Sequence, residues 1–585
     1  MKNPREARKR DSGASDSFGQ TPCLWFGSEW LPAAGGPFSR WRLRTRTLTD
    51  NQLSMRSRTL RRLAAVVGVS LFVQGASAQY PSRTIDGSGN NQADPTMGAA
   101  FTYLKRATAV GYDDGYSVPA GPTRPSARAI SNMVSAQAGA MPNAAGLSDM
   151  LWQWGQFLDH DIDLTESAKP AESFDIQVPP GDPFFDPTFT GTQVIPLSRS
   201  LYGLDADGVR QQINEITAWI DASMVYGSDQ ARALELRTLD GTGRLKTQAT
   251  AVGELLPFNV NGLPNAPTSM DPTLFLAGDV RANEQNGLTA LHTLFVREHN
   301  ALATLIYFTF PTLGGDQIYE FVRMMVGAEI QAITYNEFLP ALLGEYAIPA
   351  YRGYDAAVDG SIMNEFSGAA FRFGHTMLPP QLMRLDGGMQ TIPDGHIALR
   401  DAFFNPDEIL TLGIEPLLRG LSAQPAQAID TRVIDDVRNF LFGPPGAGGF
   451  DLASLNMQRG RDHGLVDYNS MREEFGLPRF ATFGEFGDDF LAWIGLGFLY
   501  SDIDNVDPWI GMLTEDKAPF SQLGGLAHVI VAEQFTKLRD GDRYWYQNVL
   551  SGALQRWVNT QTLAVIIRRN TTIGFEIPDD VFRVK

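Results

Sequence analysis

The sequence predicts a mainly α-helical protein built as a single large domain. Apolar residues recur at helical spacing in six stretches, whereas strand-like alternation is short and scattered. A length of 585 residues alone would suggest about three or four domains. However, no Pro/Gly/Ser-rich linker, internal repeat or low-complexity block divides the chain after residue 80. The predicted helices span residues 149–160, 288–306, 317–338, 363–377, 430–442 and 525–538.

The first predicted helix, 149–160, ends in a dense run of polar side chains. At about 100° per residue, Gln156, Asp159 and His160 share one arc with Asp163, whereas Asp161 points roughly the other way. A solvated acidic face would be the ordinary explanation of such a run. Burial is favoured here because the same stretch carries large apolar side chains, and burying polar groups is costly. These apolar neighbours are Trp152, Trp154, Phe157 and Leu158.

Two further helices carry histidines. His292 and His299 share a face of the helix 288–306, but seven residues are about two turns, which is too far for one metal ion. We expect both to be structural. In the helix 363–377, apolar residues surround His375 at helical spacing, and a lone histidine on such a face is most often a core residue. The predictions of the helices 317–338, 430–442 and 525–538 rest on periodicity alone.

Residues 217–228 predict a loop rich in oxygen ligands. Thr217, Trp219, Asp221 and Ser223 alternate, so an extended loop would turn them to one side. Hydroxyl, carboxylate and backbone carbonyl oxygens suit calcium better than zinc, and Trp219 would contribute only its carbonyl. Taken alone, the pattern is typical of a hairpin or turn. Its value is that a calcium site would explain Asp161, the carboxylate on the far side of the first helix.

The N-terminal 78 residues differ from the rest of the chain. A basic stretch, an apolar run over 63–73 and a small-residue pattern before Gln79 predict a secretory signal peptide over 55–78. The apolar run is too short to cross a bilayer comfortably. Residues 1–54 are polar and unpatterned, and we interpret them as the product of a wrongly chosen upstream start codon. A disordered extension is the alternative. The mature domain would span 79–585.

The charge balance excludes several partners. Of the 48 Lys and Arg and the 66 Asp and Glu residues, 13 and 5 fall within 1–78, which leaves 35 basic and 61 acidic side chains. Such an acidic surface repels nucleic acid and anionic lipid. The only cysteine, Cys23, precedes the mature domain, so thiol nucleophiles and disulfides are excluded there. The composition fits a secreted or periplasmic protein with a large core.

Several blocks in one order resemble the animal haem peroxidases. They are residues 154–165, 217–228, 279–286, 369–377 and 455–464, and the resemblance extends over roughly residues 80 to 585. It implies a haem between the helices 149–160 and 363–377. Vertebrate members of the family carry several disulfides, and their absence from this chain favours a distant, bacterial branch.

The resemblance assigns roles to residues on both sides of that haem. His375 would be the axial iron ligand, with Asn456 holding its other ring nitrogen and Arg459 pairing with a haem propionate. On the opposite side, His160 would move protons, Arg281 would help to split hydrogen peroxide, and Gln156 would position water or a halide. The family places calcium at the positions of Asp161 and the loop 217–223.

Two carboxylates match ester-forming positions of the family. Asp159 and Glu284 would link a haem b covalently to the protein. Some members form a third link through a methionine just after the glutamate. This chain has Gln285 there, so the third link should be missing.

The expected activity is a peroxidase that reduces hydrogen peroxide and oxidises halides, thiocyanate or phenolic donors, as in a response to oxidative stress. A fatty-acid dioxygenase on the same scaffold is one alternative. Such enzymes carry a radical-forming tyrosine three residues before the proximal histidine, and this chain has Arg372 there. A non-catalytic adhesive or matrix protein is the other alternative, although every catalytic position is filled.

Overall fold

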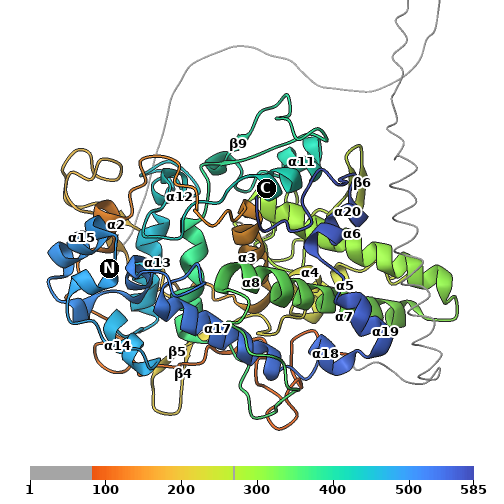
Figure 1. Ribbon diagram of the computed structural model, residues 1–585, viewed down its shortest axis with the longest axis horizontal. Helices are drawn as coiled ribbons and strands as arrows, with labels where there is room; N and C mark the ends of the chain where they lie inside the picture. Colours follow the sequence, from red (N-terminus) through yellow and green to blue (C-terminus); the bar gives the residue numbers. More distant parts are fainter. Residues whose placement is uncertain (1–81, 268–269, 585) are drawn as a thin grey trace, which may run out of the picture. The chain divides into compact units, whose positions relative to one another are not determined.

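The computed structural model describes residues 82–267 and 270–584 (Figure 1). The predicted segments 1–54 and 55–78 lie outside these residues, as does Cys23. The described chain is mainly helical, as predicted, and its short strands form small antiparallel sheets. None of the described helices combines the length and the apolar character needed to cross a membrane.

Four of the six predicted helices are present close to their predicted bounds. They are α3 (Asp149–Ile162), α6 (Asn286–Thr309), α7 (Gly315–Ile333) and α17 (Gly525–Asp540). The stretch predicted as 317–338 continues from α7 into a π-helical turn, η1 (Thr334–Phe338), and then into α8 (Leu339–Leu343).

The remaining helices are mostly short. They are α2 (Ala127–Val134), α4 (Ser223–Tyr226), α5 (Gln230–Glu235), α9 (Asn364–Gly368), α10 (Pro406–Leu412), α11 (Glu415–Ala423), α12 (Asp435–Arg438), α13 (Leu452–Asp462), α14 (Tyr468–Glu474), α15 (Phe490–Tyr500), α16 (Pro508–Thr514), α18 (Tyr546–Val549), α19 (Gly552–Val558) and α20 (Leu563–Asn570).

The strands are two to five residues long. β5 (Arg210–Asn214) lies between β1 (Thr102–Tyr103) and β4 (Tyr202–Leu204), and each pairs with it antiparallel. The other strands form two-stranded antiparallel pairs. These are β2 (Ile176–Gln177) with β3 (Val194–Ile195), β6 (Gln248–Thr250) with β7 (Gly253–Leu255), and β8 (Gln381–Leu382) with β9 (Ile397–Ala398).

Two predicted helices are wrong in part. The stretch 363–377 divides into α9 and a 3₁₀ helix, η2 (Ala370–Thr376), because Ala369 leaves the helical region with φ −144° and ψ −63°. Of 430–442, only α12 is helical. The backbone N–H of Val433 donates to the carbonyl of Ser135 at 2.9 Å, so tertiary pairing there replaces the first helical turn.

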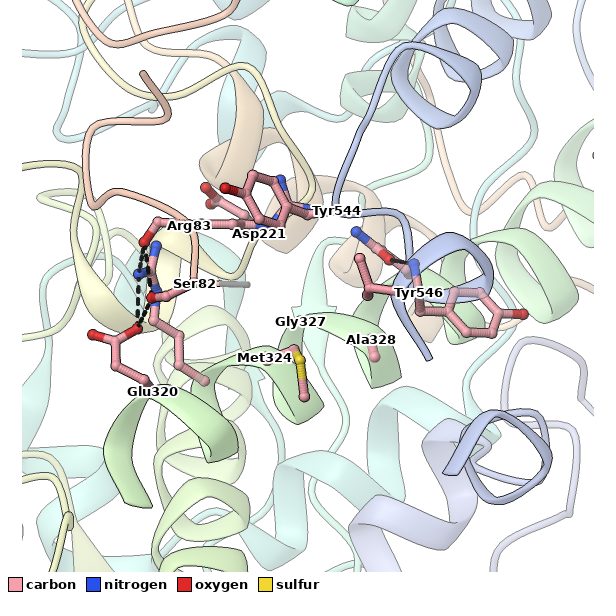
Figure 2. Close-up of a pocket in the computed structure, with 12 residues that line it drawn as sticks. Ser82, Arg83, Asp221, Glu320, Met324, Gly327, Ala328, Tyr544 and Tyr546 are labelled. Atoms are coloured by element: carbon pink, nitrogen blue, oxygen red, sulfur yellow. Dashed lines mark hydrogen bonds and ion pairs between the residues drawn. The ribbon is translucent and has the colours of Figure 1, made fainter. Parts of the chain in front are cut away.

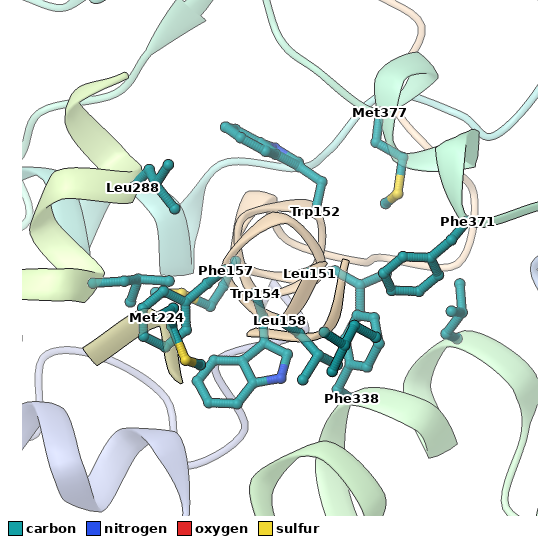
Figure 3. Close-up of a cluster of buried hydrophobic side chains, with 14 of the residues drawn as sticks. Leu151, Trp152, Trp154, Phe157, Leu158, Met224, Leu288, Phe338, Phe371 and Met377 are labelled. Carbon is teal, nitrogen blue, oxygen red and sulfur yellow. The ribbon is translucent and has the colours of Figure 1, made fainter. Parts of the chain in front are cut away.

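Helix α3 lies at the centre of the hydrophobic core. Figure 3 shows Trp154, Phe157 and Leu158 projecting from this helix toward side chains of other elements. The Phe157 ring stacks on Phe295 of α6 at 5.2 Å and meets the His292 ring edge-on at 5.0 Å. His292 is fully buried, as the structural interpretation requires. This packing fixes the rotation of α3, and therefore the direction in which its polar residues point.

Candidate active site

One cavity brings together most of the predicted catalytic and haem-binding residues. It encloses about 320 Å³ and is lined by Gln156, Asp159 and His160 of α3. The segment before α6 adds Arg281 and Glu284, and η2 adds His375. Asp161 is buried but does not line the cavity, which agrees with its predicted opposite direction on α3. The side-chain periodicity of one helix thus separates two sites.

His160 is a buried imidazole that is held neutral. It is 3% exposed, and burial, followed by the nearby Arg281 charge, keeps its pKa well below the usual value. Its Nδ1 lies 3.5 Å from Oδ1 of Asp279 but makes no hydrogen bond within the described residues. A neutral imidazole at the cavity wall can accept a proton from a bound molecule.

Asp279 connects His160 to Arg281, a role that the sequence did not predict. Its carboxylate accepts from the backbone N–H of Arg281 at 2.8 Å, from Nε at 2.9 Å and from Nη2 at 2.9 Å. The guanidinium also donates to the carbonyl of Asp163 at 2.9 Å. These contacts hold the pKa of Asp279 below its usual range despite burial. The Asp-x-Arg spacing, which lets a side chain bond the backbone two residues on, was the available signal.

Gln156 is held by neighbours on the α6 side. Its Nε2 donates to Oε1 of Glu284 at 3.2 Å, and its Oε1 accepts from Nε2 of Gln285 at 3.1 Å. Gln285 also caps α6, because its side-chain oxygen accepts from the N–H of Gly287 at 2.6 Å. Gln285, at the position where some members of the family have a methionine, therefore fixes the side-chain amide of Gln156 at the cavity wall.

The two predicted ester-forming carboxyls both line the cavity and are disfavoured as anions. Burial raises the pKa of Asp159 to about 7, and neighbouring Asp163 adds to this rise. Burial raises the pKa of Glu284 to about 7 as well. Esters carry no charge, so ester formation would remove the penalty of ionising either carboxyl in this enclosed space.

His375 makes one contact with a protein polar group and leaves its other nitrogen free. Its Nδ1 lies 2.8 Å from Nδ2 of Asn456 on α13, and within the described residues Nε2 has no hydrogen-bond partner. Burial, followed by the Arg372 charge, lowers its pKa to about 3. Metal ligation through Nε2 needs a proton on Nδ1 and an acceptor opposite it. A half-turn of the Asn456 amide would supply that acceptor, with loss of the 3.4 Å contact in which Asn456 Oδ1 accepts from Nη1 of Arg372.

Two arginines differ in their relation to the cavity. Arg459 does not line it, and its Nη1 donates to Ser198 O at 3.0 Å, Ser200 Oγ at 2.8 Å and Asp462 Oδ2 at 2.9 Å. Arg372 does line it, with Nε donating to Ser367 O at 2.7 Å. The propionate role of Arg459 stays a prediction, and Arg372 is a second cation, which faces the cavity itself.

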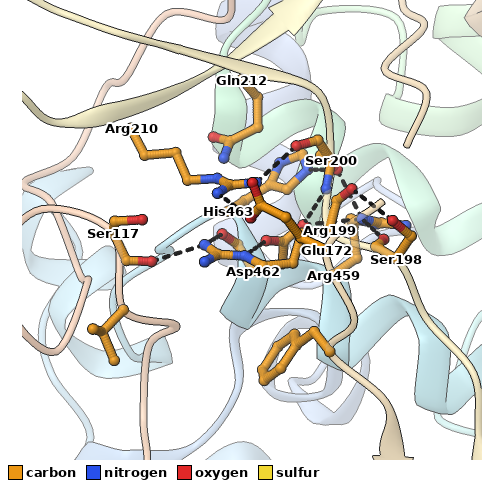
Figure 4. Close-up of polar contacts among 12 residues, drawn as sticks. Ser117, Glu172, Ser198, Arg199, Ser200, Arg210, Gln212, Arg459, Asp462 and His463 are labelled. Carbon is orange, nitrogen blue, oxygen red and sulfur yellow. Dashed lines mark hydrogen bonds and ion pairs between the residues drawn. The ribbon is translucent and has the colours of Figure 1, made fainter. Parts of the chain in front are cut away.

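Figure 4 shows the polar cluster around His463, Arg459 and Asp462. The His463 ring is paired at both nitrogens, with Nε2 at 2.8 Å from Ser200 Oγ and Nδ1 at 2.7 Å from Asn364 Oδ1. His463 is 1% exposed and does not line the cavity that contains His160. A serine, a histidine and an amide in line could suggest nucleophilic catalysis, but burial leaves no access for a substrate, which agrees with a structural role.

The predicted calcium loop lies behind α3, against Asp161. Oδ2 of Asp161 accepts from the N–H of Ala222 at 3.1 Å, and Ser223 Oγ donates to the Asp161 carbonyl at 2.8 Å. The predicted extended conformation is wrong: residues 218–221 bend, Ala222 has φ 66°, and Ser223 begins α4. These bends bring Thr217 Oγ1 within 3.2 Å of Asp221 Oδ2.

The chemistry of this oxygen cluster fits a cation. Oδ1 of Asp161 is buried without a hydrogen-bond partner in the described residues. Burial, with repulsion from Asp221 next, raises the pKa of Asp161 to about 8. Within residues 82–267 and 270–584, no group of three or more His, Cys, Asp or Glu side chains is placed to hold a metal ion. A site here would therefore combine two carboxylates with hydroxyl and carbonyl oxygens, which is a donor set for calcium.

On its other side, Asp221 lines a small polar cavity with Arg83 (Figure 2). The charge of Arg83, and then that of Arg323, opposes the rise in the pKa of Asp221 that burial causes. Ser82 Oγ donates to Glu320 Oε2 at 2.6 Å at the edge of the same cavity. Asp221 is thus shared between the oxygen cluster and a fixed positive charge.

The comparisons with known proteins agree with the fold and the cavity. A family model described as animal haem peroxidase matches residues 82–582. Peroxinectin A from Dictyostelium discoideum is 36% identical, over 86% of this chain and 95% of that protein. Eosinophil peroxidase from Homo sapiens is 36% identical, over 94% of this chain and 82% of that protein.

Solved structures give the same result. Peroxidase A from Dictyostelium discoideum has a TM-score of 0.81 at 35% identity, covering 86% of this chain and 99% of that one. A fatty acid alpha-dioxygenase from Arabidopsis thaliana has a TM-score of 0.72 at 19% identity, covering 87% and 84%. This second likeness concerns the fold alone.

Fold and relatives together define the class: the protein is a haem peroxidase. More specifically, the chain belongs to the animal haem peroxidase family, as the sequence blocks predicted.

Proposed function

We propose that this enzyme reduces hydrogen peroxide and oxidises halides, thiocyanate or phenolic donors in the cavity between α3 and η2. One observation supports this most: Asp279 holds Arg281 by three hydrogen bonds and lies 3.5 Å from His160, so a base and a cation share one anchor at the cavity wall. His375, whose Nε2 has no hydrogen-bond partner in the described residues, lines the same cavity.

The residues that line the cavity fit haem b. His375 would ligate the iron, Asn456 would orient its ring, and Arg372 or Arg459 would pair with a propionate. Asp159 and Glu284 would form two ester links. When bound, the haem would supply the iron at which peroxide is reduced and would hold the oxidising equivalents until donors return the electrons.

Proton transfer in this proposal belongs to His160. The neutral imidazole takes the proton from one oxygen of hydrogen peroxide and returns it to the departing oxygen, which leaves as water. Arg281 stabilises the negative charge that develops as the O–O bond breaks, because its guanidinium is already oriented by Asp279. Gln156, fixed by Glu284 and Gln285, positions water or a small anion beside them.

Calcium would stabilise this arrangement from behind. An ion between Asp161 and the loop 217–223 would neutralise two buried carboxylates and hold α3 against α4. We also propose that residues 55–78 direct export to a secreted or periplasmic location, that residues 1–54 are not part of the mature protein, and that 79–585 form the catalytic domain.

Fatty-acid dioxygenation is less well supported. The position three residues before His375 is Arg372, whose side chain lines the cavity and cannot form a tyrosyl radical. The acidic Asp159 and Glu284 also lie where two haem links are expected.

An absorption spectrum tests the proposal. The mature protein loaded with haem should show a Soret band that shifts with one equivalent of hydrogen peroxide and recovers on addition of iodide or a phenol. A protein that binds haem but does not respond to peroxide would contradict a peroxidase role. A mass shift of the peptides containing Asp159 and Glu284 would test the ester links separately.

A further inference from the structure

A second cavity lies where α7 passes through the π-helical turn η1 into α8. It encloses about 190 Å³, and its walls include the rings of Tyr335, Tyr351, Trp545 and Tyr546. A cavity of about 150 Å³ is enough for benzene, so a single phenol ring fits here. Single π-helical turns are rare in proteins and are frequent at functional sites.

Two buried polar atoms of this cavity have no hydrogen-bond partner among the described residues. Arg539 is 5% exposed, and its Nη2 has no hydrogen-bond partner within the described residues, although Nε pairs with Asp540 at 2.7 Å. The hydroxyl of Tyr351, whose ring centroid lies 5.5 Å from the same guanidinium, is also buried without a partner in the described part of the chain. Unpaired buried polar atoms are costly in a packed protein, so a ligand that accepts one hydrogen bond and offers a ring to the aromatic walls suits this cavity.

Aromatic rings join this cavity to the haem cavity. Trp545 meets Tyr335 edge-on with centroids 4.7 Å apart, and Tyr335 meets Phe535 of α17 at 6.1 Å. Phe535 meets Phe371 at 5.7 Å, and Phe371 lines the haem cavity. Every ring in this series contacts the next, although the residues are far apart in the sequence.

We propose that the cavity at η1 is a second donor site, which binds phenols and passes their electrons through Trp545 and the ring series Tyr335–Phe535–Phe371 to the haem cavity. The proposal rests on the peroxidase function proposed above and names one of its donor classes and its place. It adds a site for donors that need not reach the haem cavity itself.

Trp545 is the side chain best suited to hold the missing electron. Its indole N–H donates to Oε1 of Gln547 at 3.3 Å, and an indole can lose an electron while keeping that proton. Tyr335 is less suited, because its hydroxyl donates to the backbone carbonyl of Phe535 at 2.5 Å, and a carbonyl is a poor acceptor of the proton that a phenol releases on oxidation. Tyr335 therefore serves as a bridging ring.

The electrons and protons balance. One hydrogen peroxide, reduced to two waters, removes two electrons, and each is replaced from Trp545. Each phenol then gives one electron to the oxidised indole and its hydroxyl proton to water at the cavity mouth, where Glu345 is exposed. Two phenols leave as phenoxyl radicals, and the two released protons equal the two that peroxide reduction consumes.

Two variants separate electron transfer from binding. Trp545→Phe keeps an aromatic ring but removes the oxidisable one, so kcat for 4-hydroxycinnamate should fall by about tenfold or more while its Kd is unchanged. Ile348→Trp fills the cavity from its half-buried wall, so the KM for 4-hydroxycinnamate and its Kd measured by calorimetry without peroxide should both rise. Trp493→Phe, in α15 and outside both cavities, is the matched control.

Iodide and electron paramagnetic resonance complete the test. Iodide should be oxidised at the wild-type rate by all three variants, which also shows that they are folded. Freezing after peroxide without donor should trap an indole radical in wild type and in Trp493→Phe, but not in Trp545→Phe. If Trp545→Phe does not oxidise iodide, the KM and Kd of Ile348→Trp for 4-hydroxycinnamate decide whether phenols use this cavity.

Unchanged phenol kinetics and an unchanged radical in Trp545→Phe would overturn the second donor site, as would a phenol Kd unaffected by Ile348→Trp. A wild-type enzyme that oxidises iodide but not 4-hydroxycinnamate would overturn this inference alone. A wild-type enzyme that oxidises neither would overturn the proposed peroxidase donors as well.

Discussion

Two buried histidines of this protein have similar charged neighbours but differ in their hydrogen bonds and in their contact with a cavity. His160 and His463 are 3% and 1% exposed, and each lies beside an aspartate and an arginine. Both nitrogens of His463 are paired with side chains, whereas Nδ1 of His160 has no hydrogen bond in the described chain and its ring lines a cavity. Burial and nearby charges are therefore alike at the two histidines. The catalytic role proposed for His160 rests on its unpaired nitrogen together with the adjoining cavity.

The largest effect that this comparison predicts follows removal of the His160 imidazole. His160→Ala should lower kcat/KM for hydrogen peroxide by about 10²–10⁴, the usual range for a positioned acid/base group. Stopped-flow measurement of the peroxide reaction checks this, with the thermal midpoint measured alongside. A loss of less than about threefold in a folded variant would show that the open ring has no catalytic use.

The second prediction concerns Asp279, which lies against both groups of the proposed mechanism, His160 and Arg281. Asp279→Asn keeps the size of the side chain but removes the charge that faces Arg281 and His160. Because Asp279 raises the His160 pKa and burial lowers it, the variant should need a still more acidic solution to protonate His160. The peroxide rate should fall by about tenfold through the weaker hold on Arg281.

A structural role for Asp279 alone would not move the pH profile. The acidic limb of the pH–kcat/KM curve should therefore shift to lower pH in Asp279→Asn, and Asp279→Glu should restore part of both rate and profile. An unchanged profile would assign Asp279 to stability only.

The third prediction concerns His463, where loss of the ring should lower stability and leave activity nearly unchanged. His463→Ala removes the partner of Asn364 Oδ1 and one of the partners of Ser200 Oγ in a buried cluster, so the free energy of unfolding should fall by about 2–4 kcal/mol. Activity per folded molecule should stay near wild type well below the melting temperature. Denaturant unfolding together with peroxidase assays checks both parts, and His528→Ala, at a half-buried ring outside both clusters, is the control. A selective loss of activity would make the two histidines functionally alike.

The sequence predicted the placement of His160 well, because helical periodicity is a local signal. The periodicity of one helix was enough to place Gln156, Asp159 and His160 together and Asp161 apart. Long-range contacts were not predictable in this way. Val433 pairs with Ser135, which removed most of a predicted helix, and Tyr335 meets Phe535 across about 200 residues of chain. Asp279 stood two residues from Arg281, yet its nearness to His160 depends on how α3 packs against α6.

The smallest effect is expected at Asp161, the carboxylate on the far side of α3. Its pKa is raised to about 8 by burial and by Asp221, so the folded protein without calcium binds this proton more tightly than the unfolded chain does. Its contribution to stability is therefore greatest at low pH and is lost as pH rises from the unfolded value, about 4, through 8. Calcium, which binds the ionised form, should recover that loss increasingly toward pH 8.

Asp161→Asn removes this contribution, because the amide cannot ionise. The difference in melting temperature between wild type in chelator and wild type in calcium should widen from pH 5 to pH 8, and the variant should show little of that widening. The expected change is a few degrees, corresponding to about 1–2 kcal/mol in a protein of this size. A calcium effect that is independent of pH, or equal in wild type and variant, would place the ion elsewhere and leave Asp161 as a buried, protonated structural residue, comparable to His463 rather than to His160.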